Sequence, residues 1–260
     1  MFKFSQKSTL VFLLISSIQS YAQDSIQLNN TWNFKVEPNM MLPHMKGNAS
    51  VSRLPTIHVS QSPSDFFNHL KFAGMLTFEA SNKDWVITSD IVYASLTANV
   101  KKDPLVLNGK LSAKQFSFEV GLLRKLTPWL ETGISANFVN LKSGFDVNMI
   151  NPKTGQPLYL DRSISKTWID PMLVARTKNL PNKKFLYTLT GEIGGFGIGS
   201  KFSWQLEGLA GYHFSDLFYV MGGYQIISMD YEKGSNNSNF VYDMDMFGPM
   251  IKLGFNFIRM

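Results

Sequence analysis

Apolar and polar residues alternate along most of this chain, and the stretch KFSWQLEGLAGYHF at 201–214 shows the pattern clearly. Aromatic or aliphatic side chains occupy nearly every second position, with polar side chains between them. Successive side chains of a β-strand point to opposite faces, so this spacing predicts strands with one apolar and one polar face. The alternation recurs from Trp32 to Val36 and from Phe247 to Phe257, close to the two ends of the mature chain.

Breaks in the alternation predict an up-and-down order of antiparallel strands. Short segments rich in turn-forming residues stand at 81–84, 124–128, 179–183 and 214–216. Longer, more polar segments at 99–109, 142–165, 194–199 and 232–239 separate the other strand ends. We predict ten strands, near residues 31–41, 69–81, 84–98, 110–124, 128–142, 165–178, 183–194, 199–213, 217–231 and 240–258. The ninth has apolar residues on both faces, which predicts a bulge near Gly222 and Gly223.

Residues 43–68 fit this scheme least well. Pro55 interrupts the run SVSRLPTIHVS, and SPSDFFN resembles a helical turn capped by Ser62 or Ser64. The segment is either an outer loop, a plug of the mouth or a further hairpin. Strand numbers from eight to twelve therefore remain open. If both ends of the mature chain lie on the side of the short turns, the number must be even.

The composition decides which face lies outside. Charged residues are 17% of the chain, against about 25% in ordinary soluble domains. The polar face consists chiefly of Ser, Thr, Gln, Asn and Gly, whereas the surface of a soluble sheet is dense in charges. Aromatic residues toward the strand ends are typical of the girdles of membrane barrels. We therefore predict an all-β transmembrane barrel with short periplasmic turns, longer extracellular loops and these membrane-facing aromatics: Trp85, Trp129, Trp168, Phe202, Trp204, Tyr212, Phe255 and Phe257.

The first 22 residues predict a secretory signal. Lys3 and Lys7 precede an apolar run from Leu10 to Ile15, and Ala22 is a small residue suited to cleavage. The run is far shorter than the roughly 20 residues of a spanning helix. We predict that residues 23–260 form one barrel domain in the outer membrane, and the chain contains no cysteine for disulfides.

Several segments together carry a resemblance to a known group. WIDPMLVAR, GEIGGFGIGSKFSWQLEGLAGYHFSD, MGGYQIISMDYE, FVYDMDMFGP and GFNF are similar to a group of small Gram-negative outer-membrane β-barrel proteins, mostly without an assigned activity. The likeness is clearest over the C-terminal hundred or so residues. It implies a membrane barrel and carries no catalytic residue across.

The polar face holds charges of both signs in nearly equal number. An unpaired charge inside a narrow barrel would be poorly solvated, so we expect these groups to pair across the lumen. The predicted network comprises Glu119, Glu131, Asp170, Arg176, Glu192, Lys201, Glu207 and Lys252. A barrel of ten strands lies closer to the filled eight-stranded barrels than to the open porins.

Patterns for chemistry are sparse. His58 and Ser60, and likewise His213 and Ser215, have a His-x-Ser spacing like that of outer-membrane lipid A deacylases. Four scattered His residues and no Cys give no transition-metal set, so no metal or cofactor is predicted. Because such short patterns arise by chance, we predict a non-enzymatic protein, with an acyl hydrolase and a secreted soluble β-barrel binding protein as alternatives.

The predicted role is that of a structural or surface protein, or a narrow conduit for small solutes. Its expected partners are outer-membrane lipid and lipopolysaccharide, together with the barrel assembly machinery during biogenesis. The net charge of +6 falls to +4 without Lys3 and Lys7 and is spread along the chain, so nucleic acid is not expected.

Overall fold

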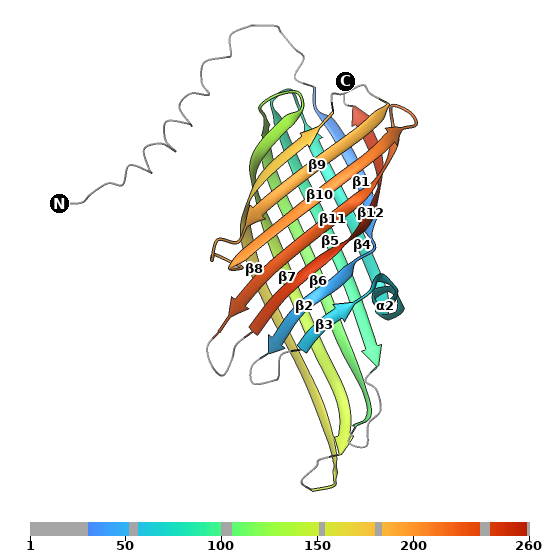
Figure 1. The fold of residues 1–260 in the computed structure, drawn as a ribbon, viewed down its shortest axis with the longest axis vertical. Coiled ribbons are helices and arrows are strands. Elements are labelled where there is room, and N and C mark those ends of the chain that lie inside the picture. The colour runs from blue at the N-terminus through green and yellow to red at the C-terminus, as the bar shows by residue number, and fades with distance from the viewer. Residues whose placement is uncertain are drawn as a thin grey trace, which may run out of the picture. The chain divides into compact units, whose positions relative to one another are not determined.

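The computed structural model describes residues 31–51, 57–99, 106–150, 154–179, 184–234 and 240–258, so the predicted signal lies outside the described residues. These residues form a closed antiparallel ten-stranded transmembrane β-barrel with an added hairpin and one short helix (Figure 1). The elements are β1 (Asn33–Met41), β2 (His44–Val51), β3 (Ile57–Gln61), α2 (Pro63–His69), β4 (Leu70–Ser81), β5 (Trp85–Asn99), β6 (Val106–Lys125), β7 (Leu130–Ile150), β8 (Pro157–Lys178), β9 (Phe185–Gly194), β10 (Phe202–His213), β11 (Phe218–Lys233) and β12 (Phe240–Ile258).

The first and last strands close the barrel. β1 pairs with β12 from Asn33↔Ile258 to Met41↔Met250, and on its other side it pairs with β4. The chain then continues along β12 as β2, which pairs from His44↔Phe247 onward, and β3 pairs with β2. The described residues of the segment 43–68, left open above, therefore form two paired strands and a helix, and the strands extend the wall along β12 at the loop end.

Three of the four predicted short turns form at the predicted places, because side chains there accept backbone hydrogen bonds, while the turn at 179–183 lies almost wholly outside the described residues. The amide oxygen of Asn82 accepts from the N–H groups of Asp84 and Trp85 at 2.9 and 2.8 Å. The hydroxyl of Thr127 accepts from Leu130 N–H, and that of Ser215 accepts from Phe218 N–H, both at 3.0 Å. Polar side chains that bond to their own backbone favour turns. We call this end of the barrel the turn end, and the opposite end the loop end.

Strand length varies widely around the barrel. β1, β4, β9 and β10 have 9 to 12 residues, close to the number that a tilted strand needs to cross a bilayer. β6, β7 and β8 have 20 to 22 residues and project beyond the others at the loop end (Figure 1). The predicted bounds of these strands were wrong at the loop end, because residues 143–150 and 157–164 continue the strands rather than forming a polar loop.

The outer face of the barrel is apolar. The exposed large hydrophobic residues include Ile134, Leu173, Leu189 and Leu206, which are 40 to 61% exposed on the ring of strands. Apolar side chains that alternate outward over a membrane-length band are the mark of a membrane barrel. No helix in the part of the chain that the structure describes is long and apolar enough to span a membrane.

The expected bulge near Gly222 and Gly223 was wrong. β11 keeps an unbroken register with both β10 and β12 through these two residues. Gly223 lies so close to the backbone of Gly208 that a Cβ atom would overlap it, so glycine here permits a close approach of strands. The apolar residues on both faces of β11 have another cause, which is the apolar lining of the lumen described below.

Helix α2 has a strong local start signal. Ser62 caps it with a full capping box: its hydroxyl accepts from Asp65 N–H at 3.2 Å, and Ser62 N–H donates to the Asp65 carboxylate at 3.1 Å. The hydrogen bond from the Ser62 hydroxyl lowers the pKa of Asp65. The predicted cap is confirmed at Ser62.

Removal of this cap should loosen the helix alone. Ser62→Ala should cost about 1 kcal/mol of helix stability, which corresponds to about fivefold faster amide hydrogen exchange in residues 63–69. The exposed Ser60, on β3, supplies the matched control Ser60→Ala, which should leave the exchange unchanged. Equal exchange in the two variants, measured by mass spectrometry, would contradict the role of the cap.

Candidate functional site

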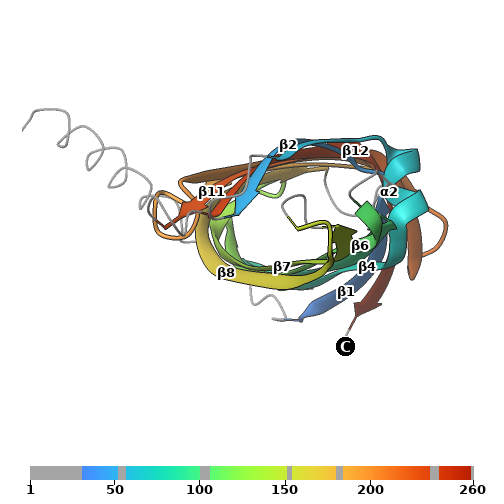
Figure 2. The same ribbon diagram turned by 90° about the horizontal axis from the view of Figure 1, so that it is seen from below.

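The barrel encloses one large cavity of about 1800 Å³. Its lining includes turn-end residues such as Asp84 and Thr127 and loop-end residues such as Val59 and Phe240. Viewed from the loop end, the wall is flattened, with β11, β12 and β2 on one side and β8, β7, β6 and β4 on the other (Figure 2). The lumen is therefore the candidate functional site.

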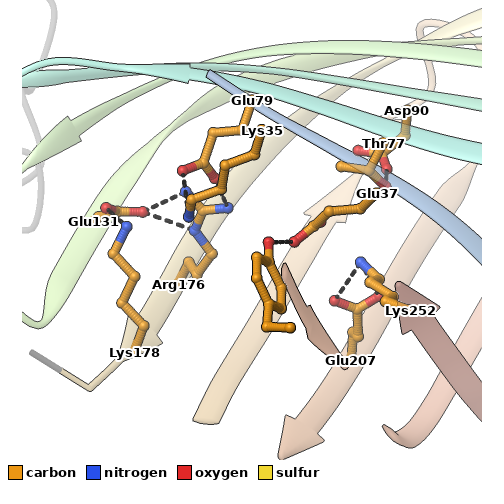
Figure 3. A network of polar contacts seen from close by, with 11 residues as sticks. Lys35, Glu37, Thr77, Glu79, Asp90, Glu131, Arg176, Lys178, Glu207 and Lys252 are labelled. Carbon is orange, nitrogen blue, oxygen red and sulfur yellow. Dashed lines mark hydrogen bonds and ion pairs between the residues drawn. The ribbon is translucent and has the colours of Figure 1, made fainter. Parts of the chain in front are cut away.

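A bridge of charges crosses the turn half of this lumen. Arg176 of β8 reaches Glu79 of β4 with its Nη1 atom 2.7 Å from Oε2, and its Nε donates to Glu131 of β7 at 2.7 Å (Figure 3). Lys35 pairs with Glu79 at 3.1 Å, and Lys178 pairs with Glu131. β4 and β8 lie four places apart in the sheet order, so Arg176 links two strands that are not neighbours. We call these five residues the Arg176 network.

Further polar contacts lie toward the middle of the barrel. Lys252 of β12 pairs with Glu207 of β10 at 3.0 Å, and the Tyr219 hydroxyl donates to Glu37 (Figure 3). Gln205 of β10 donates to Glu119 of β6 at 3.5 Å, and its neighbour in register is the buried Glu192. Six of the eight predicted network residues thus face the lumen, in separate contacts rather than as one network.

Asp170 has a different role from the predicted one. It is fully buried, and its carboxylate accepts from the Trp168 indole N–H at 3.0 Å and from Ser200 N–H at 2.6 Å. Gly199 lies against this carboxylate, so a side chain there would overlap it. Asp170 therefore anchors the loop between β9 and β10 to the wall instead of pairing with Arg176.

The prediction that Trp168 faces the membrane was wrong. Trp168 is 5% exposed, and its ring stacks on Tyr231 with centroids 4.0 Å apart. It has the same strand parity as Asp170 and Arg176, so it points inward with them. β9 pairs with β8 only from Met172 onward, and beyond this point the Trp168–Tyr231 stack joins β8 to β11.

The prediction that Lys201 belongs to the lumen network was also wrong. Its side chain is 56% exposed and pairs with Glu232. Lys201 precedes β10 at the loop end, where its backbone N–H bonds to Asp230. The Lys201–Glu232 ion pair therefore joins two neighbouring strand ends in contact with water, outside the lumen.

The other predicted aromatics lie on the outer face of the barrel. Trp85, Trp129, Phe202, Tyr212 and Phe257 are 40 to 50% exposed. Trp204 and Phe255 are half-buried, and Phe255 packs against Phe218 with ring centroids 5.4 Å apart.

The loop half of the lumen is apolar, which the sequence analysis did not predict. The cavity is lined by nine methionines: Met40, Met41, Met45, Met75, Met221, Met229, Met244, Met246 and Met250. Leu141, Phe240 and Tyr242 pack with Met229 and Met244 in one buried cluster. We call this loop half of the cavity the methionine chamber. The signal that could have found it is the set of methionines at the even positions 244, 246 and 250, on the inward parity of Lys252.

The His-x-Ser pairs lack the geometry of a nucleophile and its base. His58 Nδ1 contacts Asn48 Oδ1 at 2.6 Å, and His213 Nδ1 contacts the carbonyl oxygen of Ser215 at 3.4 Å. The Ser215 hydroxyl accepts from Phe218 N–H instead. No group of three or more potential metal ligands occurs among the described residues.

No protein-family model and no curated protein matches the sequence. The barrel is similar to the toluene transporter TodX of Pseudomonas putida, at 9% identity and a TM-score of 0.36 over 88% of this chain and 91% of that chain. Ail, the attachment invasion locus protein of Yersinia pestis, gives 10% identity and a TM-score of 0.38 over 88% of this chain and 100% of that chain. The CymD monoaromatic hydrocarbon channel gives 9% identity and a TM-score of 0.34 over 89% of this chain and 90% of that chain. These likenesses concern barrel architecture alone.

Proposed function

We propose that this protein is a non-enzymatic barrel of the outer membrane and a narrow conduit for small solutes, held nearly closed by the Arg176 network. One observation carries the proposal: a single cavity has lining residues from both ends of the barrel, and the Arg176–Glu79 bridge crosses it between the non-neighbouring strands β8 and β4. The outer membrane is the compartment that fits a barrel with an apolar outer face and a predicted secretory signal. Outer-membrane lipid and lipopolysaccharide are its proposed surroundings, reached through the barrel assembly machinery.

The ion pairs suit a gate better than a permanent filling. Each charge that crosses the lumen belongs to a side chain, and the strands that carry Arg176 and Glu79 are not neighbours. Side-chain rotations on a microsecond scale or faster therefore suffice to open a path, with no change in the wall.

Conductance across a planar lipid bilayer tests this function. The wild-type barrel should conduct weakly, and Arg176→Ala should conduct severalfold more because the bridge between β4 and β8 is gone. Lys201→Ala is the control, since it removes an ion pair outside the lumen. If Arg176→Ala inserts as a folded barrel but conducts no better than wild type, the conduit is wrong, and a structural or surface role remains.

A further inference from the structure

The wall of the barrel has a seam beside α2. β1 pairs with β4 only as far as Asn39↔Met75, while β4 itself begins at Leu70. In the described residues, the stretch Leu70–Gly74 has β5 on one side and no strand on the other. After β1 the chain pairs with β12 as β2 and does not continue along β4. Helix α2 connects β3 to β4 (Figure 2).

The cavity reaches the outer surface through this seam. Met40 is 51% exposed on the outer face of β1, yet it also lines the cavity. Gly74 and Tyr93 are partners in register with outward parity, and both line the cavity as well. Outward-facing residues such as Phe257 also line the cavity, but they lie at the turn-end mouth. Away from the mouths, a cavity behind an unbroken wall would touch inward-facing residues only, so Met40, Gly74 and Tyr93 mark a further opening.

Helix α2 covers the opening without being fixed there. Phe66 and Phe67 of the helix line the cavity, but none of the seven helical residues is buried. Its structure comes from its own capping box rather than from packing on the wall. A segment with few buried apolar contacts opens at low free energy.

The side chains behind the seam favour an apolar ligand. The seam lies where the short strand β1 ends, at the level of Met40 and Met41, and the methionine chamber begins there. Methionine side chains are flexible and polarisable, so they adapt to apolar molecules of different shape. Each Å² of apolar ligand surface that these side chains remove from water stabilises binding by about 25 cal/mol.

We propose that the seam between β1, β4 and α2 is a side entrance through which a small uncharged apolar molecule passes into the methionine chamber and binds. This inference deepens the proposed conduit and rests on it. It names an entrance and a ligand class, whereas the Arg176 network controls the path beyond the chamber.

A single thiol can report on the chamber, because the chain has no cysteine. Met229 lines the cavity and is 5% exposed, so Met229→Cys places the thiol inside. The barrel in phospholipid vesicles is labelled with N-cyclohexylmaleimide, which is uncharged, and with a trimethylammonium methanethiosulfonate, which is a cation. Relative to the rates on the unfolded chain, the maleimide should react at least tenfold faster than the cation. Naphthalene at saturation should slow the reaction by occupying the chamber.

Glycine substitutions then test the entrance. A Cβ at Gly74 has its nearest neighbour, a ring carbon of Phe72, 3.7 Å away, so Gly74→Trp fills the seam without striking the backbone. It should slow maleimide labelling at least fivefold. Gly191→Trp is the matched control: Gly191 also has outward parity and space for a side chain, but it is paired on both sides. This variant should label at the rate of the parent.

Equal rates for Gly74→Trp and Gly191→Trp would overturn the side entrance, and equal relative rates for the two reagents would overturn the apolar chamber. Should Met229→Cys fail to fold, the half-buried Met246 provides a second thiol position in the same lining. Failure of the conduit itself would appear in the conductance of Arg176→Ala, which does not depend on the labelling rates.

Discussion

Replacement of Arg176 by alanine should lower the free energy of unfolding by about 3 kcal/mol, the low end for a broken buried ion pair, because Glu79 and Glu131 each keep only one lysine partner. Glu131 is 0% and Glu79 is 7% exposed, and Arg176 contacts both. Urea unfolding in lipid vesicles, followed by tryptophan fluorescence, measures the loss. An exposed ion pair has a far smaller value, about 0 to 1 kcal/mol.

Two controls separate charge burial from lost packing. Lys201→Ala removes the exposed pair with Glu232 and should change the free energy of unfolding by less than about 1 kcal/mol. Arg176→Met keeps most of the side-chain volume but removes the charge, so it should lose nearly as much as Arg176→Ala. A loss below about 1 kcal/mol for Arg176→Ala alone would show that water in the lumen solvates both carboxylates.

A positive charge on the outer face of the short strands should be nearly as costly. Leu189 lies in the middle of β9 and is 47% exposed, so Leu189→Arg should lower the free energy of unfolding by about 2 to 4 kcal/mol if lipid surrounds it. Unfolding in vesicles of the same lipid gives the measurement. The physical reason is the cost of holding a guanidinium near the centre of a bilayer.

Leu111 supplies a matched control for this variant. It is also 47% exposed, although with the inward parity of Glu119, and it lies in the part of β6 that extends beyond the short strands into water at the loop end. Leu111→Arg should therefore change the free energy of unfolding by less than about 1 kcal/mol. Equal losses at the two sites would mean that both leucines face the same solvent, as in the secreted soluble barrel considered as an alternative.

The wrong prediction for Trp168 shows how two sequence signals compete. Aromatic residues near strand ends predict an interfacial girdle, and Trp168 was assigned to it. Its parity with Asp170 and Arg176 predicts the opposite face. Parity is the stronger signal within one strand, because the backbone fixes the alternation, whereas an aromatic ring is stable in lipid or in a packed lumen.

The two halves of the lumen could be predicted to different degrees. Polar side chains at inward positions indicated the charged turn half, and Glu131, Arg176, Glu207 and Lys252 lie there in ion pairs. Their partners were not predictable, because Glu79 meets Arg176 only after the sheet has closed. The methionine chamber was missed because apolar residues on the inward face look like a blurred alternation, as in β11.

Local alternation, turn residues and the cap at Ser62 follow from the order of residues alone, since each depends on neighbours within a few positions of the chain. They were sufficient for the strand order, the short turns and the apolar outer face. The salt bridges across the lumen, the stack of Trp168 on Tyr231 and the seam at Gly74 depend on which strands face or leave one another. Only the closed sheet brings such distant residues together, because curvature and register, rather than sequence spacing, determine what lies across the lumen.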